Sequence, residues 1–270
     1  SGITRKIVFS YFESLERKYY NLADAIITTA PYAYEYMEEK YGIDKDKVFH
    51  IPHGLYIDEF DKNLELDDKV LSDNLRQVLD NNFCVTYTGA LSKSEGLPTF
   101  VESAKYLKDI SEIKLVIVGS GSEKPILEKI IKEEKLDNVI MIDRQPRNFV
   151  PLILKKSDIL FCGLMEREAF KYGISKNKFY DYMASKKPII FASNVRGSLI
   201  DKAKAGITIK PHEPENLAKT IKYIYENIDT IGKQYGENGR KYVEMYHTNE
   251  KIAELFMNVI EFCNFRIKSN

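Results

Sequence analysis

The hydrophobic and polar positions of this chain form two alternating patterns. Short apolar runs recur along it, and some are continuous, as at residues 115–118 and 159–161. Continuous runs of this kind are typical of parallel strands that are buried on both faces. Between them lie segments whose apolar residues are three and four positions apart, which is the spacing of one helix face. The alternation predicts an α/β fold built from βαβ units, with a parallel sheet and right-handed crossovers.

The same pattern divides the chain. Helix, strand, helix and strand fill residues 1–52, and a polar linker with a helix near residues 67–79 fills 53–80. A longer series of strands and helices covers 81–246, and one amphipathic helix covers 247–270. The expected strands lie at residues 24–29, 48–52, 83–88, 114–118, 139–142, 158–162, 188–192 and 206–209.

Composition adds few constraints. The 40 basic and 40 acidic side chains balance, so the charge of the whole chain favours neither nucleic acid nor a membrane as a partner. Cys84, Cys162 and Cys263 are far apart, as is typical of free thiols in a reducing compartment. No apolar stretch reaches the roughly 20 residues that a membrane-spanning helix needs. We therefore expect a cytoplasmic protein.

Two glycine-containing turns follow expected strands. Gly119 and Gly121 come between a strand and a helix, and Gly89 ends another strand. Backbone N–H groups at such turns can bind phosphate, helped by the helix dipole. Lys124 stands where a dinucleotide-binding fingerprint has its third glycine, which disfavours a nicotinamide or flavin enzyme. An ordinary tight turn explains these glycines equally well.

The segment 172–188 has the richest combination of polar groups. Gly173 frees the backbone, and helical periodicity begins at Asn177, a residue type that can cap a helix. Lys178 lies in the first turn, where a cation opposes the helix dipole, and a bound anion would resolve that conflict. Asp181 lies one turn after Asn177, where its carboxylate could accept hydrogen bonds from both hydroxyls of a ribose. A solvated surface lysine and aspartate are the alternative interpretation.

Other chemistries find no support in the sequence. His50 and His53 are close together, but no carboxylate or cysteine is grouped with them, so we expect no metal. A Gly-x-Ser-x-Gly nucleophile elbow is absent. Basic residues are not interleaved with aromatic ones as a nucleic-acid platform requires, so we expect no nucleic acid partner.

Six short segments stand in an order and spacing that point to one family. They are ADAII at 23–27, VFHIPHG at 48–54, YTGAL at 87–91, VGSG at 118–121, KFYDYMA at 178–184 followed by Pro188, and AGI at 205–207 with ENLA at 215–218. Together they resemble the C-terminal half of retaining GT-B glycosyltransferases of the glycogen-synthase-like superfamily, family four. Each segment alone is a weak signal, but six in this order are specific. The resemblance covers nearly the whole chain and implies a Rossmann-like C-terminal domain.

The chain is most similar to a subgroup of that family, the bacterial fucosaminyl-transferase-like amino-sugar transferases. Ala90 and Glu95 stand where the broader family has an arginine and a lysine that hold the donor diphosphate. Gly173 and Asp181 replace two glutamates that are eight residues apart. The resemblance implies that backbone amides near Gly173 and the ammonium group of Lys178 take over phosphate binding.

The resemblance implies a site for a nucleotide-sugar donor, with no metal or cofactor. Lys178 and Asp181 would be the catalytic residues, as the phosphate-binding cation and the ribose acceptor. Glycines would line the floor of the cleft, and residues after strand 139–142 would border the base. The full donor-binding set is Gly89, Ala90, Gly119, Gly121, Arg144, Gln145, Pro146, Tyr172, Gly173, Ile174, Ser175, Asn177, Lys178 and Asp181.

The implied reaction moves a sugar from a donor of the UDP-N-acetylhexosamine type to a glycan or lipid-linked acceptor in cell-surface polysaccharide synthesis. Residues 1–52 would be a remnant of the N-terminal acceptor domain, and 247–270 would pack back toward it. We expect the rest of that domain to be absent, along with any peripheral contact that it makes with the inner face of the membrane. We therefore expect donor binding with little or no transfer. Two alternatives are a non-catalytic GT-B subunit or regulatory module that needs a partner, and a UDP-sugar epimerase.

Overall fold

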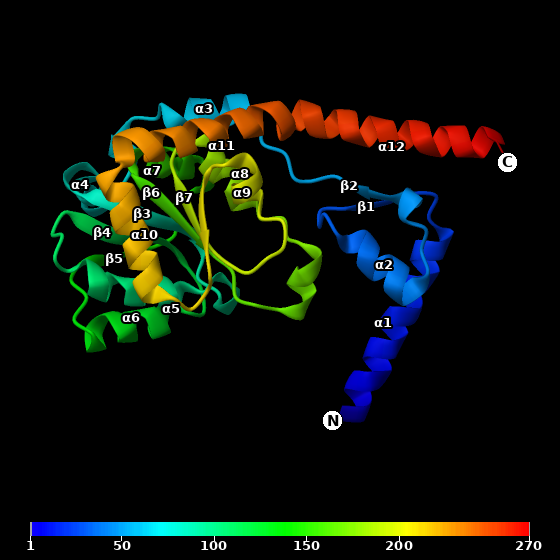
Figure 1. Ribbon diagram of the computed structural model, residues 1–270, viewed down its shortest axis with the longest axis horizontal. Coiled ribbons are helices and arrows are strands. Elements are labelled where there is room, and N and C mark those ends of the chain that lie inside the picture. Colours follow the sequence, from blue (N-terminus) through cyan, green and yellow to red (C-terminus); the bar gives the residue numbers. More distant parts are fainter. Residues whose placement is uncertain (1, 270) are drawn as a thin grey trace.

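A six-stranded parallel sheet is the main element of the structure. The computed structural model describes the backbone of residues 2–269 and the side chains of 6–168 and 170–266. The strand order is β5-β4-β3-β6-β7-β8, and every pairing is parallel, so the expected α/β architecture is confirmed (Figure 1). The strands are β3 (Phe83–Ala90), β4 (Ile113–Ser120), β5 (Val139–Ile142), β6 (Ile159–Gly163), β7 (Ile189–Ala192) and β8 (Gly206–Ile209).

The strand order reverses between β3 and β6. The chain runs outward from β3 through β4 to β5 and then returns to place β6 on the other side of β3. Thr86 pairs with Val116 of β4 on one side and with Leu160 of β6 on the other. Such a reversal leaves a crevice at the carboxyl ends of the two central strands, because their connections leave toward opposite faces.

Helices cover both faces of the sheet, since alternate residues of each strand point to opposite sides. Leu115 and Ile117 of β4 belong to the core of one face, and Val116 and Val118 belong to the core of the other. The helices on the first face are α5 (Leu97–Ser103), α6 (Lys124–Glu133) and α10 (Pro214–Glu226). Those on the second are α3 (Ile57–Leu64), α4 (Asp73–Asn81), α7 (Val150–Lys156), α8 (Asn177–Ala184), α9 (Leu199–Ala203) and α11 (Lys233–Tyr246).

The N-terminal residues form a smaller unit at one end of the molecule (Figure 1). It contains α1 (Gly2–Leu22) and α2 (Ala33–Tyr41), with β1 (Ile26–Thr28) and β2 (Val48–His50) paired as a two-stranded parallel sheet. Parallel sheets are normally larger and covered on both faces. Large apolar side chains of α1 are exposed here, among them Ile7, Phe12 and Leu22.

The last helix, α12 (Asn249–Ser269), spans from the main sheet to the N-terminal unit, as Figure 1 shows. The ring of Phe262 packs edge-on against that of Phe49 of β2, with ring centroids 5.0 Å apart. Within residues 2–269, no helix is both long enough and apolar enough to span a membrane.

Two chain segments pass each other where the N-terminal unit joins the main sheet. The Leu55 N–H donates to the carbonyl of His247 (2.8 Å), and the Asn249 N–H donates to the carbonyl of Leu55 (3.2 Å). Gly54 lies so close to Asn249 that a Cβ atom on it would overlap that side chain. The ring of His247 is buried against Tyr180, with ring centroids 4.8 Å apart.

The structure corrects one expected segment while keeping the expected strands. Residues 139–142 and 206–209 form strands with the expected bounds, and the other strands lie within a few residues of their expected places. The segment 53–80 was expected to be a linker with one helix, but it also contains α3. Ile57, Phe60 and Leu64 of α3 have the spacing of one helix face and pack in the core, so this spacing was the signal that could have revealed the helix.

The second helix of that segment starts later than expected. A 3-10 turn at Asp68–Val70 precedes it, and α4 begins at Asp73. Ser72 sets this start, because its hydroxyl accepts a hydrogen bond from the Leu75 N–H (3.4 Å).

Burial of His247 makes the stability of the fold depend on pH. Burial lowers the pKa of His247 to about 4, although a hydrogen bond to the His53 backbone opposes the change. The unfolded chain binds the proton near pH 6.5, so stability that is present at pH 7 is lost as pH falls from about 6.5 toward 4. We expect this residue alone to lower the free energy of unfolding by about 2 kcal/mol between pH 7 and pH 5.

Urea unfolding of the wild type and of His247→Gln at these two pH values measures the effect. The variant cannot titrate, so its loss of stability should be smaller by about that 2 kcal/mol. Equal losses in the two proteins would contradict the assignment.

Candidate functional site

A cleft of about 830 Å³ opens beside the carboxyl end of β3. Its lining side chains come from residues 54–63, 88–95, 147–151 and 176–181. The first segment is the crossover from the N-terminal unit to the main sheet, together with α3. The second is the end of β3 and the loop after it, the third is the 3-10 turn before α7 with the first residues of α7, and the fourth is the start of α8. Ligands of open α/β sheets bind at this edge, where the strand order reverses.

Two tyrosine hydroxyls hold the end of β3 at this cleft. The hydroxyl of Tyr87 donates to the carbonyl of Ala90 (2.6 Å), and that of Tyr182 in α8 accepts from the Thr88 N–H (2.9 Å). Both side chains are fully buried. Burial raises the pKa of both Tyr87 and Tyr182, so both stay neutral and serve as hydrogen-bonding groups.

Close backbone packing forms the floor of the cleft. Gly89 has a φ of 143°, and a Cβ on it would lie 3.1 Å from Nζ of Lys178. Behind it, a Cβ on Gly119 would overlap the carbonyl oxygen of Gly89, and one on Gly121 would overlap the backbone of Leu91. Gly119 and Gly121 therefore support the floor from behind and are not among the lining residues.

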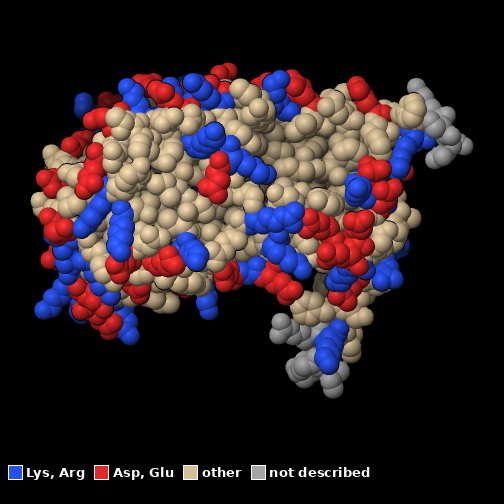
Figure 2. Space-filling model, in the orientation of Figure 1, with Lys and Arg blue, Asp and Glu red and all other residues tan. Residues whose placement is uncertain are grey.

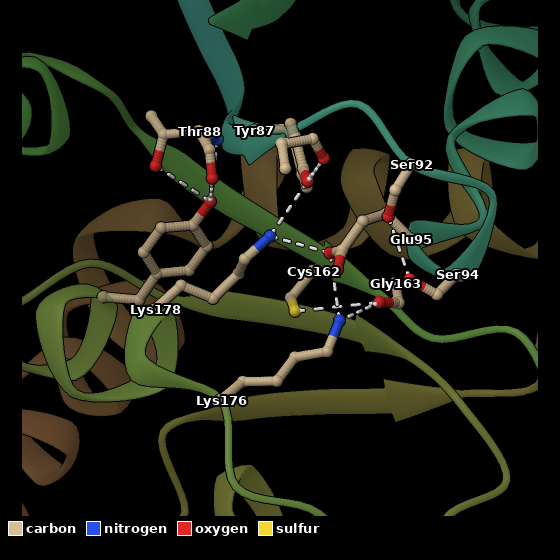
Figure 3. Close-up of polar contacts among 11 residues, drawn as sticks. Tyr87, Thr88, Ser92, Ser94, Glu95, Cys162, Gly163, Lys176 and Lys178 are labelled. Carbon is tan, nitrogen blue, oxygen red and sulfur yellow. Dashed lines mark hydrogen bonds and ion pairs between the residues drawn. The ribbon is translucent and has the colours of Figure 1, made fainter. Parts of the chain in front are cut away.

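Two lysines converge on one carboxylate at the cleft (Figure 3). Lys176 and Lys178 donate to the same oxygen, Oε2 of Glu95, at 2.9 and 2.7 Å. Nζ of Lys178 also donates to the Tyr87 hydroxyl (2.9 Å), and Nζ of Lys176 donates to the carbonyl of Gly163 (2.8 Å). Burial raises the pKa of the Glu95 carboxyl, but the two ammonium groups outweigh burial and leave that pKa below its usual value. Glu95 is therefore ionised between two cations.

Asp181 lines the same cleft from α8. Burial raises the pKa of its carboxyl, and Arg147 on the neighbouring lining segment opposes that rise. Within the described part of the chain, no hydrogen bond to this carboxyl is found. A mostly buried carboxylate without a partner is a group that a ligand can satisfy.

Five of the expected donor-binding residues meet at this cleft: Gly89, Ala90, Asn177, Lys178 and Asp181. One detail of the expected helix start is wrong. Asn177 is the first helical residue of α8 and not its cap; the cap position belongs to the preceding lysine, which makes no side-chain capping bond.

A second group of expected residues lies outside the cleft, and two of them face the N-terminal unit. The carbonyl of Tyr172 accepts a hydrogen bond from the Tyr32 N–H (3.0 Å), and Gly173 packs beside it against the same unit. Ile174 packs against the hydrophobic core, and Oγ of Ser175 makes a hydrogen bond with a tyrosine hydroxyl of α8. None of these four residues, Tyr172 to Ser175, is among the residues that line the cleft.

The expected base-binding residues lie just outside the cleft. Arg144, Gln145 and Pro146 follow β5, as expected, but the lining residues of this loop are the next two, Arg147 and Asn148. Residues 144–146 and residues 147–148 belong to the same connection between β5 and α7. The lining residues therefore lie a few positions later in the chain than the residues that we expected to border the base.

Several lining residues carried no recognisable signal in the sequence. Tyr56, Glu59 and Asn63 come from the crossover and the unexpected helix α3. Lys176 was visible only as the first lysine of a Lys-x-Lys pair, and Glu95 only as a departure from a family pattern. These residues come together at the cleft only through contacts between segments that are far apart in the sequence.

Charged groups on the face of the molecule that Figure 2 shows are mixed. Figure 2 shows Lys and Arg side chains interspersed with Asp and Glu side chains, without a continuous basic area on this face.

The family of the chain follows from comparison with known proteins. Residues 73–242 match the family described as "Glycosyl transferases group 1", and the chain belongs to that family. It is 22% identical to O-antigen chain mannosyltransferase C of Escherichia coli over 95% of the chain and 66% of that protein. It is 24% identical to the capsular polysaccharide biosynthesis glycosyltransferase CapM of Staphylococcus aureus over 76% of the chain and 52% of that protein. The chain thus spans between half and two thirds of the length of these relatives.

Solved structures show the same fold. A glycosyltransferase from Rickettsia africae superposes with a TM-score of 0.73 at 21% identity, covering 91% of this chain and 65% of that one. HepE of Anabaena, solved in complex with UDP and glucose, gives 0.70 at 16% identity, covering 88% of this chain and 63% of that one. The architecture is that of GT-B glycosyltransferases, which confirms the expected fold class.

Removal of one hydroxyl should test how the edge of β3 is held. Tyr182→Phe leaves the buried Thr88 N–H without its hydrogen-bond acceptor. We expect a loss of about 1–3 kcal/mol in the free energy of unfolding, which is the cost of an unsatisfied buried donor.

Tyr223→Phe is the matched control, because Tyr223 is 44% exposed. It should change the free energy of unfolding by less than about 0.5 kcal/mol. Chemical denaturation of both variants gives the comparison, and losses of equal size would contradict the role of the Tyr182 hydroxyl.

Proposed function

We propose that the cleft binds the nucleoside diphosphate of a nucleotide-sugar donor, and that the chain is the donor-binding part of a retaining glycosyltransferase. The observation that carries the proposal is the ammonium group of Lys178, which lies beside Gly89 in the cleft at the reversal of strand order. Membership of the group 1 family supports it.

Charge stabilisation at the phosphates is the chemistry that such a site would supply. In sugar transfer, the bond between the anomeric carbon and a phosphate oxygen breaks, and its electron pair leaves with the diphosphate. Preorganised donors aimed at that growing charge contribute most to catalysis. We assign this role to Lys178, whose ammonium group already sits in a largely buried place. Backbone N–H groups beside Gly89 and at the start of α8 are its proposed partners.

Asp181 is the proposed acceptor for the ribose. Its carboxyl lines the cleft in the second turn of α8 and has no hydrogen bond within the described residues. Ribose hydroxyls would supply the missing donors. Arg147, whose charge acts on the Asp181 carboxyl, lines the same cleft together with Asn148, so we assign the base to that region in place of Arg144, Gln145 and Pro146.

The donor and the product are proposed from the relatives. The names of the matched proteins refer to O-antigen and capsular polysaccharide, and HepE was solved with UDP and glucose. We propose a donor of the UDP-N-acetylhexosamine type and a glycan or lipid-linked acceptor in cell-surface polysaccharide synthesis.

The N-terminal unit supports a second candidate, a subunit that needs a partner to act. Its two-stranded parallel sheet and the exposed apolar side chains of α1, such as Ile7 and Phe12, present a surface suited to a further α/β layer. In this second candidate function, the chain supplies the donor site and a separate partner unit supplies the acceptor site. Transfer activity that appears only when such a unit is added would favour this candidate over independent transfer.

Calorimetric titration with UDP, GDP, ADP and UDP-N-acetylglucosamine tests the proposal directly. We expect one nucleoside diphosphate to bind with a dissociation constant of about 1 mM or lower, as for a site with charged hydrogen bonds. If none of these compounds binds to correctly folded protein, the proposed donor site is wrong.

Two variants separate the proposed roles. Lys178→Ala should lower the affinity for the diphosphate about tenfold or more and leave the affinity for the matching nucleoside little changed, because the lost contact is to phosphate.

Asp181→Asn should lower the affinities for nucleoside and diphosphate alike, because both contain the ribose. Lys171→Ala, an exposed lysine outside this cleft, is the control and should change neither. Equal losses for nucleoside and diphosphate in Lys178→Ala would exclude its phosphate role.

A further inference from the structure

Lys176 is a second ammonium group at the cleft, with no role in the function proposed above. The side chains of Lys176, Lys178 and Glu95 are 14%, 16% and 12% exposed, so this cluster is mostly withdrawn from water. All three residues line the cleft. Figure 3 shows the two lysine side chains reaching the carboxylate from different sides.

The charges of this cluster do not balance. Among the residues that the structure describes, Glu95 is the one carboxylate within ion-pair distance of either ammonium group. One negative charge therefore faces two positive charges in a site with little water. Excess charge in a desolvated site is costly unless a counter-charge joins it. A pairing that served the fold alone would be balanced, so the excess positive charge indicates a place for an anion.

Each ammonium group also has a hydrogen-bond donor left over. A lysine ammonium carries three N–H donors. Lys178 uses one on Glu95 and one on Tyr87, and Lys176 uses one on Glu95 and one on the carbonyl of Gly163. The remaining N–H of each group belongs to a residue that lines the cleft, so it can reach a ligand there.

Backbone contacts fix Glu95 between the lysines. A Cβ on Gly163 would overlap the carbonyl oxygen of Glu95, so the loop after β3 lies directly on the end of β6. The Met165 N–H donates to the carbonyl of Ser94 (2.9 Å) and ties the same two segments together. Gly96, which follows, has a φ of 62° and turns the chain into α5. The carboxylate is therefore held in place and keeps the two ammonium groups from repelling each other.

We propose that Lys176 binds the donor diphosphate together with Lys178, and that Glu95 is a positioning residue that holds both ammonium groups for it. This inference rests on the proposed function and adds a second phosphate-binding residue to the same site. Two N–H donors that are already oriented would meet neighbouring phosphate oxygens without reorganisation on binding.

Two variants test the inference through the net charge. Lys176→Met removes one positive charge and keeps a long side chain. The double variant Lys176→Met with Glu95→Gln removes one charge of each sign, so Lys178 remains and the cluster keeps its excess of one positive charge. Calorimetry with UDP and uridine gives the affinities; GDP or ADP, with its nucleoside, replaces them if it binds the wild type more tightly.

We expect Lys176→Met to weaken UDP about tenfold or more and to change uridine less than about twofold, since the lost contact is to phosphate. The double variant should stay weak, and Lys176→Arg should recover most of the affinity, because it restores the charge. Lys93→Met is the control: Lys93 is an exposed lysine on the same loop as Glu95 and does not line the cleft. It should leave both affinities within about twofold, because an exposed charge is screened.

Other results would overturn the inference. Wild-type affinity for UDP in the double variant would mean that Lys176 only neutralises Glu95. Equal losses for UDP and uridine, or no loss in Lys176→Met, would also exclude a phosphate contact. A wild-type chain that binds no nucleoside diphosphate would reject the proposed function itself. By contrast, UDP binding that falls in Lys178→Ala but not in Lys176→Met would reject this inference alone.

Discussion

The cleft depends on the way in which the chain leaves β3 and β6. These strands pair side by side, but β3 continues into α5 on one face of the sheet and β6 continues toward α8 on the other. The backbone cannot close the edge between two connections that diverge. Polar side chains from both connections therefore meet at that edge. Glu95 and Lys178 form an ion pair of 2.7 Å across it, although 83 residues separate them in the sequence.

Neutral hydrogen bonds under the cleft keep this edge rigid. The buried hydroxyls of Tyr87 and Tyr182 bind the last residues of β3, and burial keeps both of them protonated. Gly89 and Gly119 let two strand ends approach each other without side chains between them. The lysines are thus presented by a fixed frame, which is a condition for strong electrostatic stabilisation.

The sequence pattern predicted those parts of the cleft that depend on residues close together in the chain. Continuous apolar runs predicted the buried strands. Lys178 was recognised because a cation is unfavourable at a helix N-terminus, and Asp181 because it lies one helical turn after Asn177. Lys178 and Asp181 do line the cleft, together with Gly89.

Long-range contacts explain the parts that the sequence could not reveal. The partnership of Glu95 with Lys176 arises only when two distant loops meet. Tyr172 and Gly173 contact the residues just before α2, because the N-terminal unit packs there. The spacing of hydrophobic residues in the sequence does not predict this contact. The shift from Arg144 to Arg147 reflects the course of a loop, which sequence patterns define poorly.

A crystal structure of the chain with a bound nucleoside diphosphate is the most direct test of the central claim. We expect the diphosphate to lie within hydrogen-bonding distance of Nζ of Lys178, and the ribose hydroxyls to bind the carboxylate of Asp181. A nucleotide held at another part of the sheet edge, or one whose phosphates point away from Lys178, would contradict it.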